Sequence, residues 1–240
     1  KMFRAKGLAW MALREDELKS PIAKFLSEEE IEAIKEVMDA ETGDLLLIVA
    51  DKPAVVAAAL GNLRLKIAEE NNLIPEDVYE FVWIVDFPLF EYDEDEDRLA
   101  ALHHPFTAPI EADVEKLDTD PASVKSKAYD LVLNGEELGG GSIRINNHKL
   151  QEKVFSALSI SEEEQQEKFG YLLEAFDYGT PPHGGIAFGL DRLMMIVGRT
   201  DSIRDVIAFP KTQKATSPLT NAPSKVDKKQ LQELGISIRS

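Results

Sequence analysis

Two acidic side chains flank the strongest turn signal in the sequence, Asn134-Gly135. A two-residue turn of this type joins two antiparallel strands, and we expect it to pair Asp130 with Gly139. Side chains alternate between the faces of a strand, so Asp130 and Glu137 should share one face of the hairpin. Two carboxylates at such a position could hold Mg²⁺ together with phosphate oxygens. The alternative is a pair of solvated acids on an exposed sheet face.

An arginine follows three consecutive glycines in the same hairpin. The run Gly139–Gly141 suggests a bulge, or a ligand pressed against the backbone. Arg144 lies between two isoleucines in a strand that should be partly buried, where a guanidinium needs a carboxylate or phosphate partner. A structural ion pair is the alternative. Strict alternation places Arg144 on the face opposite Glu137, so a shared site requires a bulge within the glycine run.

Two adjacent histidines, His103 and His104, precede Pro105-Phe106. Adjacent side chains on an extended chain point apart, so we do not expect them to share a metal ion. One histidine could contact a ligand while the other packs, or both could be ordinary loop residues.

A glycine-rich segment leads into a helix with an arginine in its first turn. Gly184, Gly185 and Gly189 would allow close approach of a flat or phosphorylated group, and Arg192 follows. A helix N-terminus attracts anions, and arginine adds a permanent positive charge. The spacing is neither a Walker nor a Rossmann glycine pattern. A strand-to-helix turn capped by Arg192 is the alternative.

The elements that must position these residues alternate between strands and helices. Apolar runs predict strands at Gly7–Arg14, Leu45–Ala50, Phe81–Phe87, Ala128–Leu133, Glu136–Asn146 and Ile186–Phe188. Apolar periodicity and capping residues predict helices after Ser27, from Pro53, at His148–Leu158 and Glu162–Asp177, from Gly189 to Val197, and at Lys228–Leu234. The acidic run Glu91–Asp97 should be a turn, and Leu99 to Ser123 a long loop.

Hairpins interspersed with helices predict an α+β fold, an antiparallel sheet with flanking helices. We expect two domains, a small αβ unit at residues 1–72 and a larger unit at residues 73–240. The composition is that of a globular protein, with 44% hydrophobic and 30% charged residues. The longest apolar run is Ala54–Leu60, too short to cross a membrane.

Cysteine is absent, which excludes a thiol nucleophile, a cysteine zinc site and disulfides. The net charge of −17 argues against nonspecific nucleic-acid binding but permits a local basic groove or a magnesium-assisted site. No apolar leader is visible at Lys1-Met2-Phe3, and a fragment boundary is expected there.

In this order, the motifs resemble those of class II aminoacyl-tRNA synthetases, and Gly185–Arg192 is similar to the third signature motif of that class. The resemblance sharpens to the bacterial type of aspartyl-tRNA synthetase at His103–Thr107, Asn134–Arg144, Pro181–Gly185 and Asp201–Lys211. Residues 1–72 resemble part of the inserted domain that these synthetases share with amidotransferase subunits. The resemblance therefore covers almost the whole chain.

The resemblance implies a role for each site residue. Arg144 would bind the side-chain carboxylate of aspartate, with His103 and the less certain His104 beside it. Asp130 and Glu137 would hold Mg²⁺ and ATP phosphates. ATP would also contact Gly189, Leu190, Asp191 and Arg192, and the catalytic residues would be Arg192 and Glu137. The implied reaction makes aspartyl-adenylate from aspartate and ATP and transfers the aspartyl group to tRNA.

The family's anticodon-binding barrel, first motif and second motif are not in this sequence, so the resemblance implies a fragment that is inactive alone. It also implies a cytoplasmic parent enzyme that is a homodimer, without membrane contact. Two other functions stay open: a tRNA-binding module like those of amidotransferases, and a class II relative that acts on a free amino acid. An assay with and without tRNA would separate the last from a tRNA ligase.

Overall fold

The computed structural model describes residues 5–75 and 77–238. The chain forms two compact units, Lys1–Val78 and Tyr79–Ser240, so the division falls six residues after the expected boundary at residue 72. None of the helices in the described part of the chain combines the length and apolarity needed to span a bilayer.

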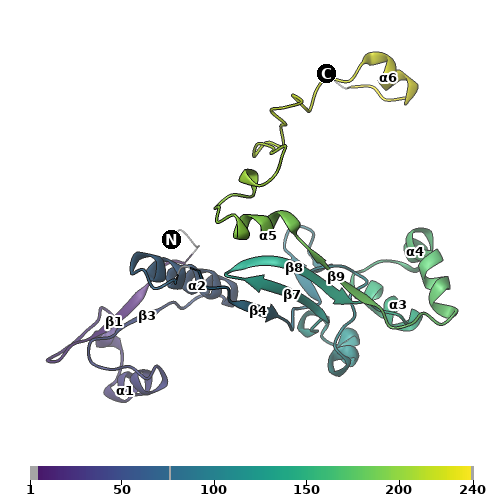
Figure 1. The fold of residues 1–240 in the computed structure, drawn as a ribbon. Coiled ribbons are helices and arrows are strands. Elements are labelled where there is room, and N and C mark those ends of the chain that lie inside the picture. Colours follow the sequence, from purple (N-terminus) through teal and green to yellow (C-terminus); the bar gives the residue numbers. More distant parts are fainter. Residues whose placement is uncertain (1–4, 76, 239–240) are drawn as a thin grey trace. The chain divides into compact units, whose positions relative to one another are not determined.

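The first unit is a small antiparallel sheet with two helices (Figure 1). Its elements are β1 (Ala9–Leu13), β2 (Leu18–Lys19), the 3-10 turn η1 (Ala23–Phe25), α1 (Glu28–Val37), β3 (Leu45–Ile48) and α2 (Pro53–Glu70). The strand order is β2-β1-β3. Met11, Leu13 and Leu46 form the core, and Ile31 and Ile34 of α1 pack against it. The predicted capping box is present, because the Ser27 hydroxyl accepts from the N–H of Glu30 and the Glu30 carboxylate accepts from the N–H of Ser27.

The second unit is built on a four-stranded antiparallel sheet in the order β4-β7-β8-β9. The strands of the unit are β4 (Phe81–Ile84), β5 (Phe90–Asp93), β6 (Arg98–Ala101), β7 (Ala128–Leu133), β8 (Glu136–Ile143) and β9 (Gly184–Phe188). Strands β5 and β6 pair with each other outside the four-stranded sheet. Its helices are α3 (His148–Ala157), α4 (Glu162–Asp177), α5 (Leu190–Val197) and α6 (Lys228–Glu233), with 3-10 turns η2 (Glu111–Asp118), η3 (Pro121–Ser123) and η4 (Ile203–Asp205). The predicted α+β fold is confirmed.

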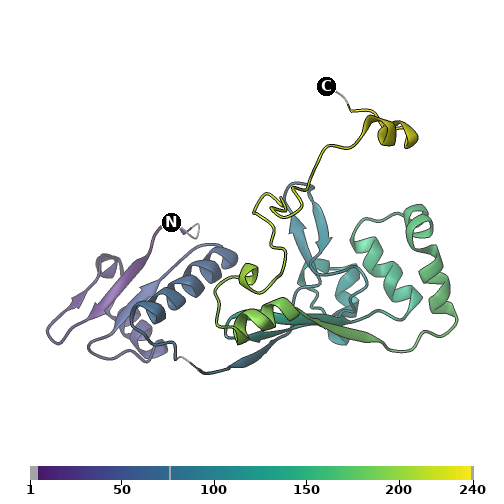
Figure 2. The same cartoon turned by 45° about the horizontal axis from the view of Figure 1, so that its top comes forward.

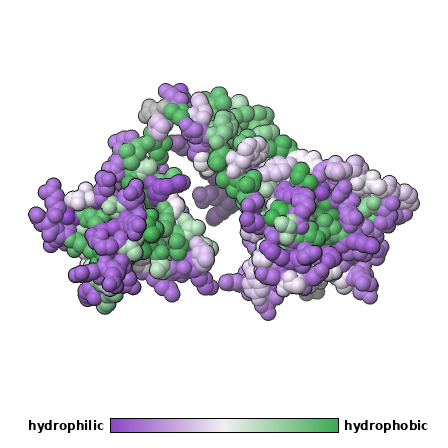
Figure 3. Space-filling model, turned by 90° about the horizontal axis from the view of Figure 1, so that it is seen from below, coloured by the Kyte–Doolittle hydropathy of each residue, from purple (hydrophilic) through white to green (hydrophobic). Residues whose placement is uncertain are grey.

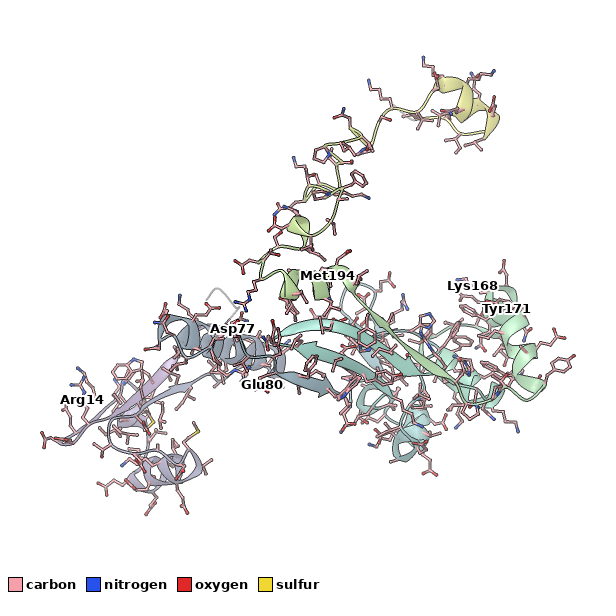
Figure 4. All side chains as sticks on the ribbon, in the orientation of Figure 1. Arg14, Asp77, Glu80, Lys168, Tyr171 and Met194 are labelled. Carbon is pink, nitrogen blue, oxygen red and sulfur yellow. The ribbon has the colours of Figure 1, made fainter. Side chains whose placement is uncertain are left out.

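Helices α3 and α4 lie side by side beyond the end of the sheet (Figure 2). Phe155 of α3 stacks on Phe169 of α4, with ring centroids 4.9 Å apart, and Phe106 contacts both rings edge-on. Lys168 and Tyr171, also on α4, are exposed (Figure 4). The face of α4 that carries Phe169 packs toward α3.

The turn predicted in the acidic run is present between two strands but is shorter than expected, and the long loop predicted after it is wrong. Glu91, Tyr92 and Asp93 belong to β5, and only residues 94–97 form the turn to β6. The segment expected as a loop from Leu99 to Ser123 contains most of β6 and the turns η2 and η3. Its apolar residues explain the difference, because Leu117 is buried in the core with Leu89 and Phe90. Packing at these few positions orders a segment whose composition is that of a loop.

Several apolar side chains of the sheet and of α5 are exposed. On β4, Phe81, Val82, Trp83 and Ile84 are 39–60% exposed, and Phe188 of β9 is 59% exposed. Hydrophobic surface interrupts the hydrophilic surface in the space-filling view (Figure 3). A strand with both faces accessible normally packs against further structure.

Candidate active site

Most of the residues singled out in the sequence line one cavity of about 590 Å³ in the second unit. The lining includes His103, His104, Asp130, Glu137, Arg144, Gly189, Asp191 and Arg192. Leu190 is not among the lining residues, and its side chain is 67% exposed. The sheet, the histidine segment and the start of α5 thus meet at one place.

The hairpin β7–β8 brings the two carboxylates together. Asn134 and Gly135 have positive φ of 50° and 87°, as the two-residue turn requires. Leu133 pairs with Glu136 and Val132 with Glu137, but Asp130 pairs with Gly140 rather than with the expected Gly139. A bulge at Leu138 shifts the register. Asp130 and Glu137 still share a face, as predicted.

The same bulge brings Arg144 to the carboxylate side. Beyond Leu138, alternation places Gly140, Ser142 and Arg144 on the face of Asp130. The irregularity expected within Gly139–Gly141 therefore exists, but it lies one residue earlier. Leu138 is buried, and its carbonyl accepts from the N–H of Gly189 at 2.7 Å. That contact ties the bulge to the start of α5.

The glycine run is needed for contacts within the protein. A Cβ at Gly139 would overlap the carbonyl oxygen of Ala187, and a Cβ at Gly141 would overlap that of Gly185. A Cβ at Gly140 would overlap the carboxylate of Asp130. The three glycines let β9 approach β8 closely and leave room for Asp130 above the strand.

The Arg144 backbone is held on both sides. Its N–H donates to the carbonyl of His183 at 2.9 Å, and it forms an isolated antiparallel bridge with Thr107. The guanidinium atom Nη1 is buried and has no hydrogen-bond partner among the described residues. In that part of the chain, Arg144 also forms no ion pair, so the alternative of a structural ion pair is not supported.

Both histidines line the cavity, and both rings also pack on phenylalanines. His103 lies edge-on to Phe87 with ring centroids 4.7 Å apart, and His104 lies edge-on to Phe106 at the same separation. That one histidine contacts a ligand while the other packs stays a prediction, since each ring both lines the cavity and packs on a phenylalanine. The chain turns at this point, since the N–H of Thr107 donates to the carbonyl of His104. Both side chains can then reach one cavity.

The charge of Arg144 affects the pKa of His104. Partial burial lowers the pKa of His104 below its ordinary value of 6.5, and the positive charge of Arg144 lowers it further. The Nδ1 atom of His104 lies 3.2 Å from the N–H of Phe106, which donates to it. His104 therefore favours the neutral ring, with its proton on Nε2.

At the start of α5, Arg192 is linked to the hairpin. Its Nη1 donates to the backbone carbonyl of Glu137 at 2.8 Å and lies 3.7 Å from the Glu137 carboxylate oxygen Oε1. Both side chains are about half exposed. This geometry places a permanent positive charge beside the Glu137 carboxylate, in the cavity that Asp130 also lines.

The chain was compared with known proteins. The model of the family described as "tRNA synthetases class II (D, K and N)" matches residues 6–213. The chain belongs to the class II tRNA synthetases. It is 71% identical over 238 residues to the aspartate–tRNA(Asp/Asn) ligase of Halothermothrix orenii and 61% identical over 236 residues to the aspartate–tRNA ligase of Clostridium botulinum. These matches cover 99% and 98% of this chain but only 40% of each relative.

Among solved structures, the aspartyl-tRNA synthetase of Entamoeba histolytica matches 80% of this chain and 32% of its own, with 23% identity and a TM-score of 0.45. This class II synthetase chain spans about 40% of the length of the two aspartate–tRNA ligases given above.

The carboxylates of this synthetase chain fit a magnesium ion only if phosphate oxygens complete its ligands. Among the described residues there is no group of three or more histidines and acids placed to hold a metal ion. Asp130 and Glu137 nevertheless line the same cavity, and Mg²⁺ is commonly held by one or two carboxylates plus substrate phosphates. These two carboxylates could hold Mg²⁺ only together with such phosphate oxygens.

Two buried hydroxyls of the synthetase cavity were not singled out from the sequence. The Thr107 hydroxyl donates to that of Ser142 at 3.3 Å, and both residues line the cavity. Ser142 could have been found, because it stands two positions before Arg144 and so shares its face. Thr107 reaches the site only through its bridge to Arg144, a long-range pairing that no local pattern reveals.

Proposed function

We propose that the chain is part of an aspartate–tRNA ligase, which activates aspartate with ATP and transfers the aspartyl group to tRNA. Membership of the class II synthetases supports the reaction type, and the names of the two relatives support aspartate as the amino acid. A homodimeric, cytoplasmic parent enzyme is also part of this proposal, and it rests on the resemblance to the class II synthetases.

The observation that carries the proposal is the Nη1 atom of Arg144, which is buried at the cavity and has no hydrogen-bond partner among the described residues. A buried guanidinium N–H without an acceptor is costly, so the site favours a ligand that brings a carboxylate. Aspartate has one carboxylate to react and a second in its side chain. Arg144 would bind the second one, with His103 and His104 alongside.

The proposed first step is attack of an α-carboxylate oxygen of aspartate on the α-phosphorus of ATP. The bond between that phosphorus and the bridging oxygen breaks, and pyrophosphate leaves with the electron pair. In the second step, a terminal ribose hydroxyl of tRNA attacks the activated carbonyl, and AMP leaves. Catalysis of this kind depends on positioning and charge neutralisation.

The residues around Glu137 would bind the nucleotide. Arg192 and the backbone from Gly189 through Leu190 and Asp191 would contact ATP, with the guanidinium toward the phosphates. Asp130 and Glu137 would hold Mg²⁺, which when bound would neutralise phosphate charge. The 2.8 Å hydrogen bond from Arg192 to the Glu137 carbonyl supports this division, since it fixes the arginine beside the carboxylates.

The test is exchange of labelled pyrophosphate into ATP by the complete enzyme, with aspartate, asparagine or glutamate as the amino acid. We expect exchange with aspartate only, and charging of tRNA with aspartate in a second assay. Exchange with aspartate but release of a free amide product without tRNA would instead identify a relative that acts on the free amino acid. No exchange with any amino acid would contradict the proposal.

A further inference from the structure

A fully buried glutamine outside the cavity holds the histidine segment from behind. Gln151 of α3 is 0% exposed, and its Nε2 donates to the carbonyl of Pro105 at 2.8 Å. The orientation of its amide follows from chemistry, because the carbonyl of Pro105 can only accept a hydrogen bond. The other amide atom, Oε1, is buried and lacks a hydrogen-bond partner among the described residues. The bond to Pro105 is therefore made although burial leaves the Oε1 atom without a partner, which costs free energy.

The bonded proline is the residue that joins the histidines to the sheet. On one side of Pro105, His103 and His104 line the cavity. On the other side, the carbonyl of Phe106 accepts from the N–H of Ile145 at 2.9 Å. The sheet therefore fixes the backbone at Phe106, while α3 fixes it at Pro105. The second attachment is the nearer one to the histidines.

The bonds from the sheet hold the histidine segment next to Arg144. The sheet bond reaches the residue after Arg144, and Thr107 bridges Arg144 itself. If the bond to Pro105 were lost, the segment would remain paired with the strand of Arg144 but could pivot before Phe106. The histidines would then move relative to Arg144 without loss of the sheet.

We propose that Gln151 is a positioning residue for the amino-acid site, acting through Pro105 to hold His103 and His104 beside Arg144. The proposal rests on the proposed function for the identity of the ligand, aspartate. Gln151 itself touches no substrate, since it is not among the residues that line the cavity.

The chain contains a matched control, Gln165 of α4. Gln165 is 4% exposed, and its Nε2 also donates to a backbone carbonyl, that of Ile160 at 2.9 Å. Ile160 precedes α4 and does not line the cavity. A substitution at Gln165 therefore removes a bond from a buried glutamine to a backbone carbonyl that does not belong to the histidine segment.

The experiment compares Gln151→Met and Gln165→Met in the complete enzyme. Methionine is close to glutamine in length and shape but cannot donate a hydrogen bond. We expect Gln151→Met to raise the KM for aspartate about five- to tenfold, the size of effect that one hydrogen bond gives, while the KM for ATP and kcat change less than about twofold. Gln165→Met should leave all three constants unchanged.

A second variant and a second measurement make the result decisive. If Gln151→Met does not fold, Gln151→Asn is the second variant, because its shorter side chain also removes the bond to Pro105 but stays polar. We again expect a higher KM for aspartate with little change in the KM for ATP or in kcat. Histidine ring resonances in NMR spectra should shift for His103 and His104 in the Gln151 variants but not in Gln165→Met. This readout does not require activity, so it still tests Gln151 if the wild-type enzyme fails to activate aspartate and the proposed function is wrong.

Three kinetic or spectroscopic results would overturn the proposal, and a fourth concerns folding. The first three are an unchanged KM for aspartate with unchanged histidine resonances, equal changes in the constants for aspartate and ATP, and equal effects of Gln151→Met and Gln165→Met. Failure of both Gln151 variants to fold would assign the residue to the fold alone and would also overturn it.

Discussion

Among single residues, Arg144 has the environment that most constrains what the cavity can bind. Its backbone is fixed by Thr107 on one side and His183 on the other, while Nη1 remains buried and unpaired in the described structure. A fixed backbone limits the positions that the guanidinium can take. The geometry therefore favours a planar anion of defined placement over a diffuse negative charge.

We predict that Arg144→Ala in the complete enzyme weakens aspartate binding far more than ATP binding. Removing one partner of a buried charge pair costs about 2–5 kcal/mol. Arg192→Ala should give the reverse pattern, because Arg192 lies beside Glu137 at the nucleotide end. Steady-state constants for both substrates test the pair, and equal losses for aspartate and ATP in Arg144→Ala would count against the assignment.

We predict that His104 titrates below pH 6.5 in the folded protein without ligand. Arg144→Gln should raise this pKa only part of the way, since burial is the larger cause and Arg144 the smaller. The lower pKa means that the folded protein favours the neutral His104 ring over the protonated one. The contribution of His104 to stability is therefore full above pH 6.5 and is lost as the pH falls through the folded pKa.

Histidine titration by NMR measures this value, with His104→Gln identifying the resonance. A His104 pKa above 6.5, or one that Arg144→Gln leaves unchanged, would show that the His104 ring and the guanidinium do not share one environment.

Among the elements, β8 and β9 lie so close together that a methyl group added between them should lower the free energy of unfolding. We predict that Gly141→Ala destabilises the fold by about 1–3 kcal/mol, because its Cβ would overlap the Gly185 carbonyl across the strands. Gly185→Ala is the matched control on the partner strand, where a Cβ would meet open space. Its effect should stay within about 0.5 kcal/mol. Denaturant unfolding of both variants tests this, and similar losses would contradict the described packing.

The hairpin shows how far a local pattern can predict structure. The Asn134-Gly135 turn determines the pairs nearest to it, so Leu133–Glu136 and Val132–Glu137 are correctly predicted. The pairing beyond them depends on Leu138, whose carbonyl accepts from Gly189, 51 positions later in the chain. A contact so distant leaves no trace in the hairpin's own sequence. For the same reason, the short-range pattern of two adjacent histidines did not reveal that both reach the cavity.

At the scale of the molecule, the chain is a part of what its relatives contain. It spans about 40% of their length, and the apolar side chains of β4 are largely exposed. The resemblance to class II synthetases implies a further arginine, in the second motif, that contacts ATP during activation. We infer that this arginine belongs to the part of the relatives that the chain does not span.

We predict that the 240-residue chain alone exchanges pyrophosphate into ATP at least about a hundredfold more slowly than the complete enzyme. Loss of one preorganised donor to the reacting phosphate typically costs about 10²–10³ in rate. The complete enzyme, assayed at the same aspartate and ATP concentrations, is the control. Exchange within about tenfold of that control would mean that the residues of this chain suffice for activation.

The extra residue at Leu138 also decides how the hairpin tolerates insertions and deletions. Seven positions separate Glu137 from Arg144, an odd number, and only the bulge makes the two side chains point the same way. Deleting Leu138 would leave an even number of positions between Glu137 and Arg144, so a regular ladder would keep the two side chains on one face. The deletion would remove the bulge and the bond from Gly189 to the Leu138 carbonyl, but it would not turn Arg144 away from the acids. A homologous chain with one residue fewer between the turn and the arginine can therefore have the same site without a bulge, whereas a chain of the same length needs the bulge.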